Sequence, residues 1–89
     1  MSEGGSPLSG EIVMYTTPWC GYCVRLKHFF VREGIAYREV NIEHDDEAAD
    51  FVQGFNNGNY TVPTVVFPGG EVLTNPAPMQ ILARVERSA

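Results

Sequence analysis

The sequence has few cysteines, few basic residues and no long apolar run. Its 89 residues include two Cys, too few for a disulfide scaffold or, alone, for a structural zinc site. Six Lys and Arg stand against eleven Asp and Glu, a formal net charge of −5, which argues against binding to nucleic acid or to an anionic membrane surface. No apolar stretch approaches the ~20 residues of a membrane span, and the polar N-terminus lacks the features of a secretory signal. We therefore expect a cytoplasmic protein in a reducing environment.

The remaining composition is typical of a small globular protein. Hydrophobic residues make up 44% of the chain and charged residues 19%, whereas disordered chains are less hydrophobic. Ser, Gly and Pro dominate residues 1–10, which we interpret as a flexible N-terminal tail. Residues 11–89 are expected to form a single domain, and we expect the protein to be a monomer.

The hydrophobic pattern predicts an α/β fold with the element order β-α-β-α-β-β-α. The predicted strands are Glu11–Thr16, Ala36–Ile42, Thr64–Phe67 and Glu71–Leu73. The predicted helices run from Cys20 to Arg32, ended by Gly34, from Asp45 to the Asn56–Asn59 loop, and from Asn75, as a cap with Pro76 at the first position. The first two strands should be parallel in a right-handed βαβ unit, and the last two should form an antiparallel hairpin. The residues expected in the core are Met14, Cys23, Leu26, Phe30, Ala48, Phe51, Val52, Phe55, Met79, Ile81, Leu82 and Val85.

One motif, Cys20-Gly21-Tyr22-Cys23, carries chemistry, because it lies between a predicted strand and the first turn of a predicted helix. Unpaired backbone N–H groups and the dipole at a helix N-terminus favour a thiolate at Cys20. Cys23 follows one turn later on the buried stripe, where apolar surroundings favour the protonated thiol. We therefore predict an exposed, nucleophilic Cys20 and a covered, slow Cys23.

Two other interpretations of the cysteines stay open. They could form half of a zinc site, which needs two further ligands; His28 points away from the Cys23 stripe and His44 lies near the next helix. They could also be inert core residues. That interpretation is disfavoured because Cys20 follows Pro18 and Trp19 at a strand end, a place that is normally exposed.

With these elements in place, the chain resembles a glutaredoxin of the thioredoxin superfamily over roughly Ile12 to Val85. The residues that match in order and spacing are Tyr15-Thr16, Cys20-Gly21-Tyr22-Cys23, Arg25, Lys27 and Thr61-Val62-Pro63. The resemblance implies a thioredoxin/glutaredoxin-like fold, a four-stranded mixed sheet flanked by three helices. It also implies that Pro63 is cis and lies beside the CxxC motif, and that the backbone of Val62 pairs with the cysteinyl part of a thiol substrate.

Three positions depart from the glutaredoxins that use glutathione. Those proteins usually carry Lys where this chain has Thr17, and often a basic residue where it has Tyr60. They also carry a Gly-Gly-x-Asp-Asp segment where this chain has residues 73–78, which contain no acid. The groups that would pair with the carboxylates and the amine of glutathione are therefore missing.

This set of departures resembles the mycoredoxins of actinobacteria. Those proteins serve mycothiol, an N-acetylcysteine joined to an amino sugar and inositol, with no free carboxylate and no free amine. The segments that match in order are Thr16–Cys23, Asn41–His44, Asn57–Val65 and Leu73–Pro76. The resemblance implies a monothiol mechanism: Cys20 takes mycothiol from a mixed disulfide, a second mycothiol regenerates Cys20, and Cys23 is needed only for a side path through an internal disulfide. Mycothiolated or disulfide-bonded proteins would be the partners and mycothiol the co-substrate, with no metal and no tightly bound cofactor.

The residues expected to line the substrate groove are Trp19, Tyr22, Tyr60, Val62 and Pro63, with Asn75 as a candidate hydrogen-bonding partner for the sugar. Each assignment has a structural alternative. Trp19 and Tyr22 could simply pack over neighbouring loops, and Asn75 could serve only as a helix cap. Arg25 and Lys27 are expected to be solvated helix charges.

Three rival functions stay open. A dithiol redoxin would reduce protein disulfides with both cysteines and be recharged by a thioredoxin reductase. A glutathione enzyme is disfavoured by the missing Asp pair. A binding module could hold an iron–sulfur cluster through Cys20, although such glutaredoxin-like proteins usually have Ser at the position of Cys23.

Overall fold

The computed structural model describes residues 11–88, with the side chains of residues 11–85, so the predicted N-terminal tail lies outside the described residues. Its elements are β1 (Ile12–Thr16), α1 (Gly21–Arg32), β2 (Tyr37–Asn41), the short 3-10 helix η2 (Ile42–His44), α2 (Asp46–Phe55), β3 (Thr64–Val66), β4 (Val72–Thr74) and α3 (Pro78–Ser88). The predicted element order is confirmed. The second strand is shorter than predicted because the chain turns into η2 at Ile42, and the fourth is displaced by one residue.

The four strands form one mixed sheet in the order β2-β1-β3-β4. Strand β1 pairs in parallel with β2 and antiparallel with β3, and β3 pairs antiparallel with β4. Val13 and Met14 on adjacent positions of β1 are both fully buried, so both faces of this central strand are covered, as its continuous apolar run predicts. Gly70, at φ +95, closes the predicted turn between β3 and β4.

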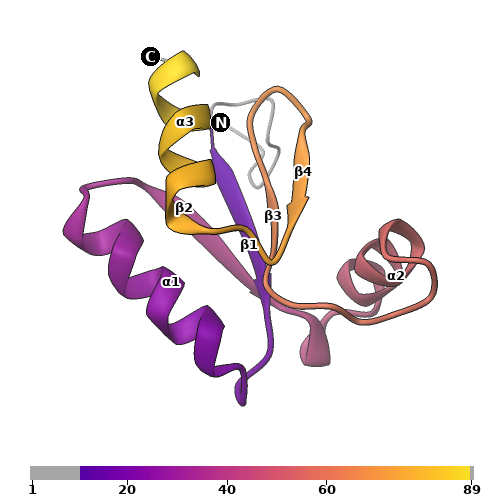
Figure 1. Ribbon diagram of the computed structural model, residues 1–89. Coiled ribbons are helices and arrows are strands. Elements are labelled where there is room, and N and C mark those ends of the chain that lie inside the picture. Colours follow the sequence, from indigo (N-terminus) through magenta and orange to yellow (C-terminus); the bar gives the residue numbers. More distant parts are fainter. Residues whose placement is uncertain (1–10, 89) are drawn as a thin grey trace.

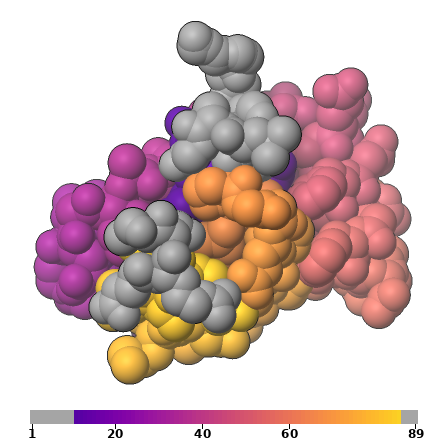
Figure 2. All heavy atoms as spheres, turned by 90° about the horizontal axis from the view of Figure 1, so that it is seen from above, coloured from indigo at the N-terminus to yellow at the C-terminus, as the bar shows by residue number. Residues whose placement is uncertain are grey.

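Helices cover both faces of the sheet (Figure 1). Helices α1 and α3 pack on one face and α2 on the other, and Figure 2 shows α1 and α2 on opposite sides of the molecule. The core between the sheet, α1 and α3 consists of Ile12, Met14, Leu26, Phe29, Phe30, Val65, Phe67 and Ile81. The smaller core under α2 consists of Ile42, Ala48 and Val52. Within residues 11–88, no helix combines the length and the apolar character that crossing a membrane requires.

Three residues predicted in the core are instead exposed. Phe51, Phe55 and Met79 have exposed fractions of 40%, 49% and 75%. Helix α2 reaches the sheet through the small residue Ala48 and through Val52, so its two Phe side chains lie beyond the covered area. The ring of Phe51 lies 5.3 Å from that of Tyr15 and stacks on Phe55 at the edge of this face.

The predicted start of the last helix is also wrong. Asn75 does not cap α3, because its backbone adopts φ +52 and its N–H donates to the Pro63 carbonyl at 2.7 Å. The helix begins at Pro78, and the Gln80 side chain accepts the N–H of Ala77 at 2.8 Å. Pro at the first position and Gln three residues after the cap follow the ordinary rules for a helix start, but two residues later than predicted.

Candidate active site

The CxxC motif opens helix α1, as predicted. Cys20 is the N-cap residue, with extended backbone angles of φ −85 and ψ 103, and its Sγ accepts the N–H of Cys23 at 3.0 Å. Its carbonyl accepts the N–H of Val24 at 3.2 Å and so begins the helix. The Cys20 sulfur therefore lies at the positive end of α1, where a thiolate is stabilised.

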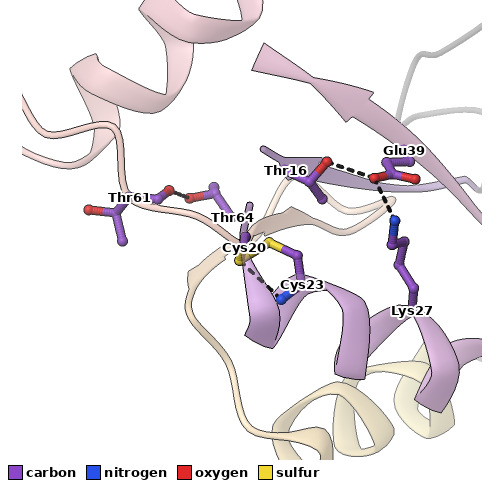
Figure 3. Close-up of a disulfide and its surroundings, with 7 residues drawn as sticks. All are labelled: Thr16, Cys20, Cys23, Lys27, Glu39, Thr61 and Thr64. Carbon is purple, nitrogen blue, oxygen red and sulfur yellow. Dashed lines mark hydrogen bonds and ion pairs between the residues drawn. A yellow bond between two sulfur atoms is a disulfide. The ribbon is translucent and has the colours of Figure 1, made fainter. Parts of the chain in front are cut away.

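The two cysteines are joined by a disulfide (Figure 3), and they differ in exposure. Cys20 is partly exposed, whereas Cys23 is 1% exposed on the core side of α1. The predicted difference in burial is confirmed, although Cys20 is half-covered rather than fully exposed. An external thiol can approach the disulfide at Cys20 and not at Cys23.

The loop after β4 connects the cis-proline segment to the CxxC motif. The Val62–Pro63 peptide bond is cis, as the resemblance implied. The Pro63 carbonyl accepts from Asn75, and one residue later the Pro76 carbonyl accepts the Tyr22 hydroxyl at 3.0 Å. These bonds hold the Pro63 segment beside the motif. They also show that the Tyr22 hydroxyl is engaged within the protein and that Asn75 contributes a backbone contact.

A second set of hydrogen bonds holds the Thr61–Thr64 segment, which includes Val62. The fully buried Thr64 donates its hydroxyl to the Thr61 carbonyl at 2.8 Å. The Asn56 amide donates to Thr64 at 3.4 Å and to the last turn of α2 at 2.8 Å, and it accepts from Thr74 at 2.7 Å. Sequence reasoning missed Asn56 because its partners come from α2, β3 and β4, so no local pattern marks it.

A polar cluster joins β1, α1 and β2 close to the motif (Figure 3). The Thr16 hydroxyl donates to the Glu39 carboxylate at 2.7 Å, and Lys27 Nζ donates to the same oxygen at 3.1 Å. Burial raises the pKa of Glu39, but the two hydrogen bonds and the Lys27 charge outweigh it and hold that pKa below its usual value. Lys27 is thus paired with Glu39 while its side chain stays 31% exposed, and Arg25 is exposed as predicted.

A cavity of about 280 Å³ lies next to the motif. Its lining residues are Thr17, Trp19, Ile42, Glu43, Ala49 and Tyr60. Trp19 directly precedes Cys20 and Tyr60 stands two residues before Val62, so two of the lining residues are close chain neighbours of the nucleophile and of the cis-proline segment. Trp19 and Tyr60 are 72% and 56% exposed and form its rim.

The cavity unites only part of the predicted groove. Trp19 and Tyr60 line it, whereas Tyr22, Val62, Pro63 and Asn75 are not among its lining residues. Tyr22 donates to the Pro76 carbonyl and Asn75 to the Pro63 carbonyl. Sequence reasoning missed Ile42, Glu43 and Ala49, which η2 and α2 bring to the cavity from 19 or more residues beyond Cys23. Among residues 11–88, no three His, Cys, Asp or Glu side chains gather where they could hold a metal ion.

A family model described as glutaredoxin matches residues 12–73 of the chain. The chain belongs to the glutaredoxin family. A Mycobacterium tuberculosis protein named as a glutaredoxin is 48% identical over 82 residues, which cover 92% of this chain and 98% of that protein. Mycoredoxin 1 of Corynebacterium glutamicum is 35% identical over 79 residues, which cover 89% of this chain and 98% of that protein.

Solved structures share the fold of this chain. The crystal structure of a mutant thioredoxin-like protein matches with a TM-score of 0.73 and 28% identity, covering 85% of this chain and 95% of that one. A glutaredoxin from Archaeoglobus fulgidus matches in fold with a TM-score of 0.71 at 23% identity, covering 96% and 98% of the two chains. This glutaredoxin is thus a thiol-disulfide oxidoreductase whose cysteine pair is Cys20 and Cys23.

Proposed function

We propose that this glutaredoxin removes mycothiol from mixed disulfides with proteins, using Cys20 as the nucleophile. The observation that carries the proposal is the charge of the cavity: none of the described residues that line it is basic. Thr17 and Tyr60, which stand where glutathione-dependent relatives carry basic residues, both belong to that lining. A thiol without a carboxylate needs no basic partner there, and the relative from Corynebacterium bears the name mycoredoxin.

The first step transfers mycothiol to Cys20. The Cys20 thiolate attacks the mycothiol sulfur of the mixed disulfide, a new disulfide forms between these two sulfurs, and the protein–mycothiol disulfide breaks. The released protein thiolate takes a proton from solvent. Helix α1 assists because its N-terminal N–H groups, including that of Cys23 at 3.0 Å from Sγ, stabilise negative charge on the Cys20 sulfur.

The second step regenerates the enzyme. The thiolate of a second mycothiol attacks the mycothiol sulfur bound to Cys20, forms mycothiol disulfide and releases the Cys20 thiolate. A stabilised thiolate is a good leaving group, so the helix N-terminus assists this step as well. Neither step uses Cys23, which is 1% exposed.

The bound mycothiol is held by the cis-proline segment and the aromatic rim. The Val62 backbone pairs with the cysteinyl part of the ligand, and the hydrogen bonds of Thr64 and Pro63 keep that segment in place. Trp19 and Tyr60 offer exposed ring faces beside the cavity, and aromatic faces suit a ligand that combines apolar and polar surface. The contact found for Asn75 is the hydrogen bond from its backbone N–H to Pro63, which does not support a role as a ligand of the sugar.

A second candidate function is supported by the disulfide itself. Cys20 and Cys23 are bonded to each other, so a dithiol route is chemically available. In that route Cys20 forms a mixed disulfide with a substrate protein, Cys23 attacks Cys20 to release the reduced substrate, and an external reductase reopens the Cys20–Cys23 bond. The dithiol route requires Cys23, whereas the monothiol route does not.

The experiment that separates these functions uses a Cys23→Ser variant and one peptide disulfide capped with either mycothiol or glutathione. Peptide release is followed with the matching free thiol as the recycling reductant. We expect a strong preference for the mycothiol form. Equal rates or a preference for glutathione would refute the thiol assignment, and no activity on either form, in a folded variant, would favour the dithiol route.

A further inference from the structure

The cavity beside Cys20 carries one charge, and that charge is negative. Of the six described residues that line it, Glu43 is the one with a carboxylate, and none is basic. We propose that Glu43 is a specificity-determining residue that excludes thiols bearing a carboxylate near the cysteinyl group and so favours uncharged sugar thiols. The proposal rests on the function proposed above, because it assumes that the thiol partner occupies this cavity.

The position of the cavity shows why the non-cysteinyl part of the thiol reaches it. The ligand sulfur bonds to Cys20, which follows Trp19 of the rim, and the cysteinyl backbone pairs with Val62. Tyr60 of the rim precedes Val62 by two residues, a separation of at most ~7 Å along the chain. A group attached to the cysteinyl unit therefore needs only one short span to enter the space between Trp19 and Tyr60. The volume of about 280 Å³ is near the lower end of small-molecule sites, about 300 to 1,000 Å³.

Glu43 is held in this position by its backbone. Its N–H donates to the Asn41 side chain at 2.9 Å, which fixes the first turn of η2. The carboxylate belongs to an exposed residue, and none of the ion pairs found among the described residues includes it. Its negative charge is therefore not neutralised by an adjacent Lys or Arg in one of those pairs.

The N-terminus of α2 offers a ligand carboxylate no compensation. Helix α2 begins directly after η2, and Asp45 caps it: the Asp45 carboxylate accepts the N–H of Ala48 at 3.0 Å. Asp46 and Glu47 add two further acidic side chains in the first turn. The positive end of α2, which would otherwise attract an anion, is thus already occupied by the protein's own carboxylates.

The size of the effect follows from Coulomb's law. If the Glu43 carboxylate and a ligand carboxylate lie ~7 Å apart, their repulsion lowers the equilibrium constant for ligand binding about 3-fold in bulk water. At an effective dielectric constant of 20, it lowers that constant about 50-fold. Solvent exposure and physiological salt keep the value near the lower limit. We expect Glu43 to lower the relative rate with a glutathione-capped substrate by about 5-fold at low salt.

The test compares Glu43→Gln and Glu43→Lys with the matched charge change Glu33→Gln. Glu33 follows the C-terminal end of α1, and that twelve-residue helix places it ~18 Å from the motif. Single-turnover release of a peptide from its glutathione and mycothiol disulfides is measured for each variant at low and high salt. We expect the glutathione-to-mycothiol rate ratio to rise about 5-fold in Glu43→Gln and to rise further in Glu43→Lys. The ratio should stay at the wild-type value in Glu33→Gln. In high salt, the ratio should differ less between the variants.

Two outcomes would overturn the role of Glu43: a ratio within 2-fold of wild type in both Glu43 variants, or an equal rise in Glu33→Gln. Failure of the proposed function shows differently, as a wild-type enzyme that does not prefer the mycothiol form. In that case a ratio that still rises in Glu43→Gln would keep the electrostatic role of Glu43, whereas the assignment of mycothiol would fall.

Discussion

Replacing Cys23 tests whether its contribution is to stability rather than to mycothiol transfer. The Cys20–Cys23 disulfide closes a short loop, with a sequence separation of 3. For a loop of about four residues, the loss of unfolded-state entropy amounts to about 2 kcal/mol at 25 °C, so reduction should lower the free energy of unfolding by that amount. Cys23→Ala in the reduced protein should cost a further 1 to 2 kcal/mol, approximately, because it removes a sulfur from a site that is 1% exposed.

A Cys23→Ser variant should be less stable than Cys23→Ala. Its hydroxyl would enter the same apolar site, and an unpaired buried hydroxyl costs about 1 to 3 kcal/mol. In a chain of 89 residues, each kcal/mol shifts the Tm by about 4 to 8 °C. Thermal unfolding by circular dichroism should therefore rank the proteins as oxidised wild type, reduced wild type, Cys23→Ala and Cys23→Ser, with a first interval of about 8 to 16 °C.

The activity of the same variants should follow a different order. At a temperature where circular dichroism shows the variants to be folded, release of mycothiol from a peptide disulfide should stay within about 3-fold of reduced wild type for both Cys23 variants, because the proposed monothiol steps do not use the Cys23 thiol. Cys20→Ser should fall to the uncatalysed rate. If a folded Cys23→Ala protein no longer released mycothiol from the peptide, the monothiol mechanism would be refuted. If reduction of the wild type left its Tm unchanged, the stabilisation calculated for the Cys20–Cys23 disulfide would be refuted.

Three further predictions concern other contacts of the site. Because the pKa of Glu39 is lowered in the folded protein, its ionised carboxylate stabilises the fold at pH values above the unfolded-state pKa of about 4.3. This stabilisation is lost as the pH falls through the folded-state pKa. Between pH 7 and pH 3, the Tm of Glu39→Gln should therefore fall less steeply than the Tm of the wild type. Trp19→Ala should leave the Tm unchanged, since Trp19 is 72% exposed, but raise KM for the mycothiol disulfide about 5-fold, equivalent to about 1 kcal/mol of ring contact; an unchanged KM would remove Trp19 from the site. Asn56→Ala should lower the free energy of unfolding by about 2 kcal/mol, because it removes hydrogen bonds to α2 and to Thr74, and a double-mutant cycle with Thr74→Val should show non-additivity.

The accuracy of the sequence predictions depended on how local their physical cause is. The start of α1 and the burial of Cys23 were predicted correctly, because a thiol at a helix N-cap and a second one turn later follow from helical periodicity alone. The cis bond at Pro63 came only from the family resemblance. The exposure of Phe51 was not predicted, because the apolar stripe of α2 does not reveal how much sheet surface lies beneath it.

The start of α3 shows a similar limit. Asn75 and Pro76 satisfy the local rules for a helix start, yet the Asn75 N–H is used by the carbonyl of Pro63. A long-range hydrogen bond therefore overrides a local preference and moves the helix to Pro78. No pattern within the segment records that bond.

The sequence by itself determined the element order, the covered central strand, and the placement of one partly exposed and one buried cysteine, because these depend on residue type and spacing along one element. Only the tertiary structure decided what surrounds Cys20. The cavity combines Trp19 from the loop after β1, Glu43 from η2 and Tyr60 from the loop before β3. Their proximity results from sheet pairing and helix packing between distant segments, so the charge that a thiol meets beside Cys20 is set by the fold as a whole.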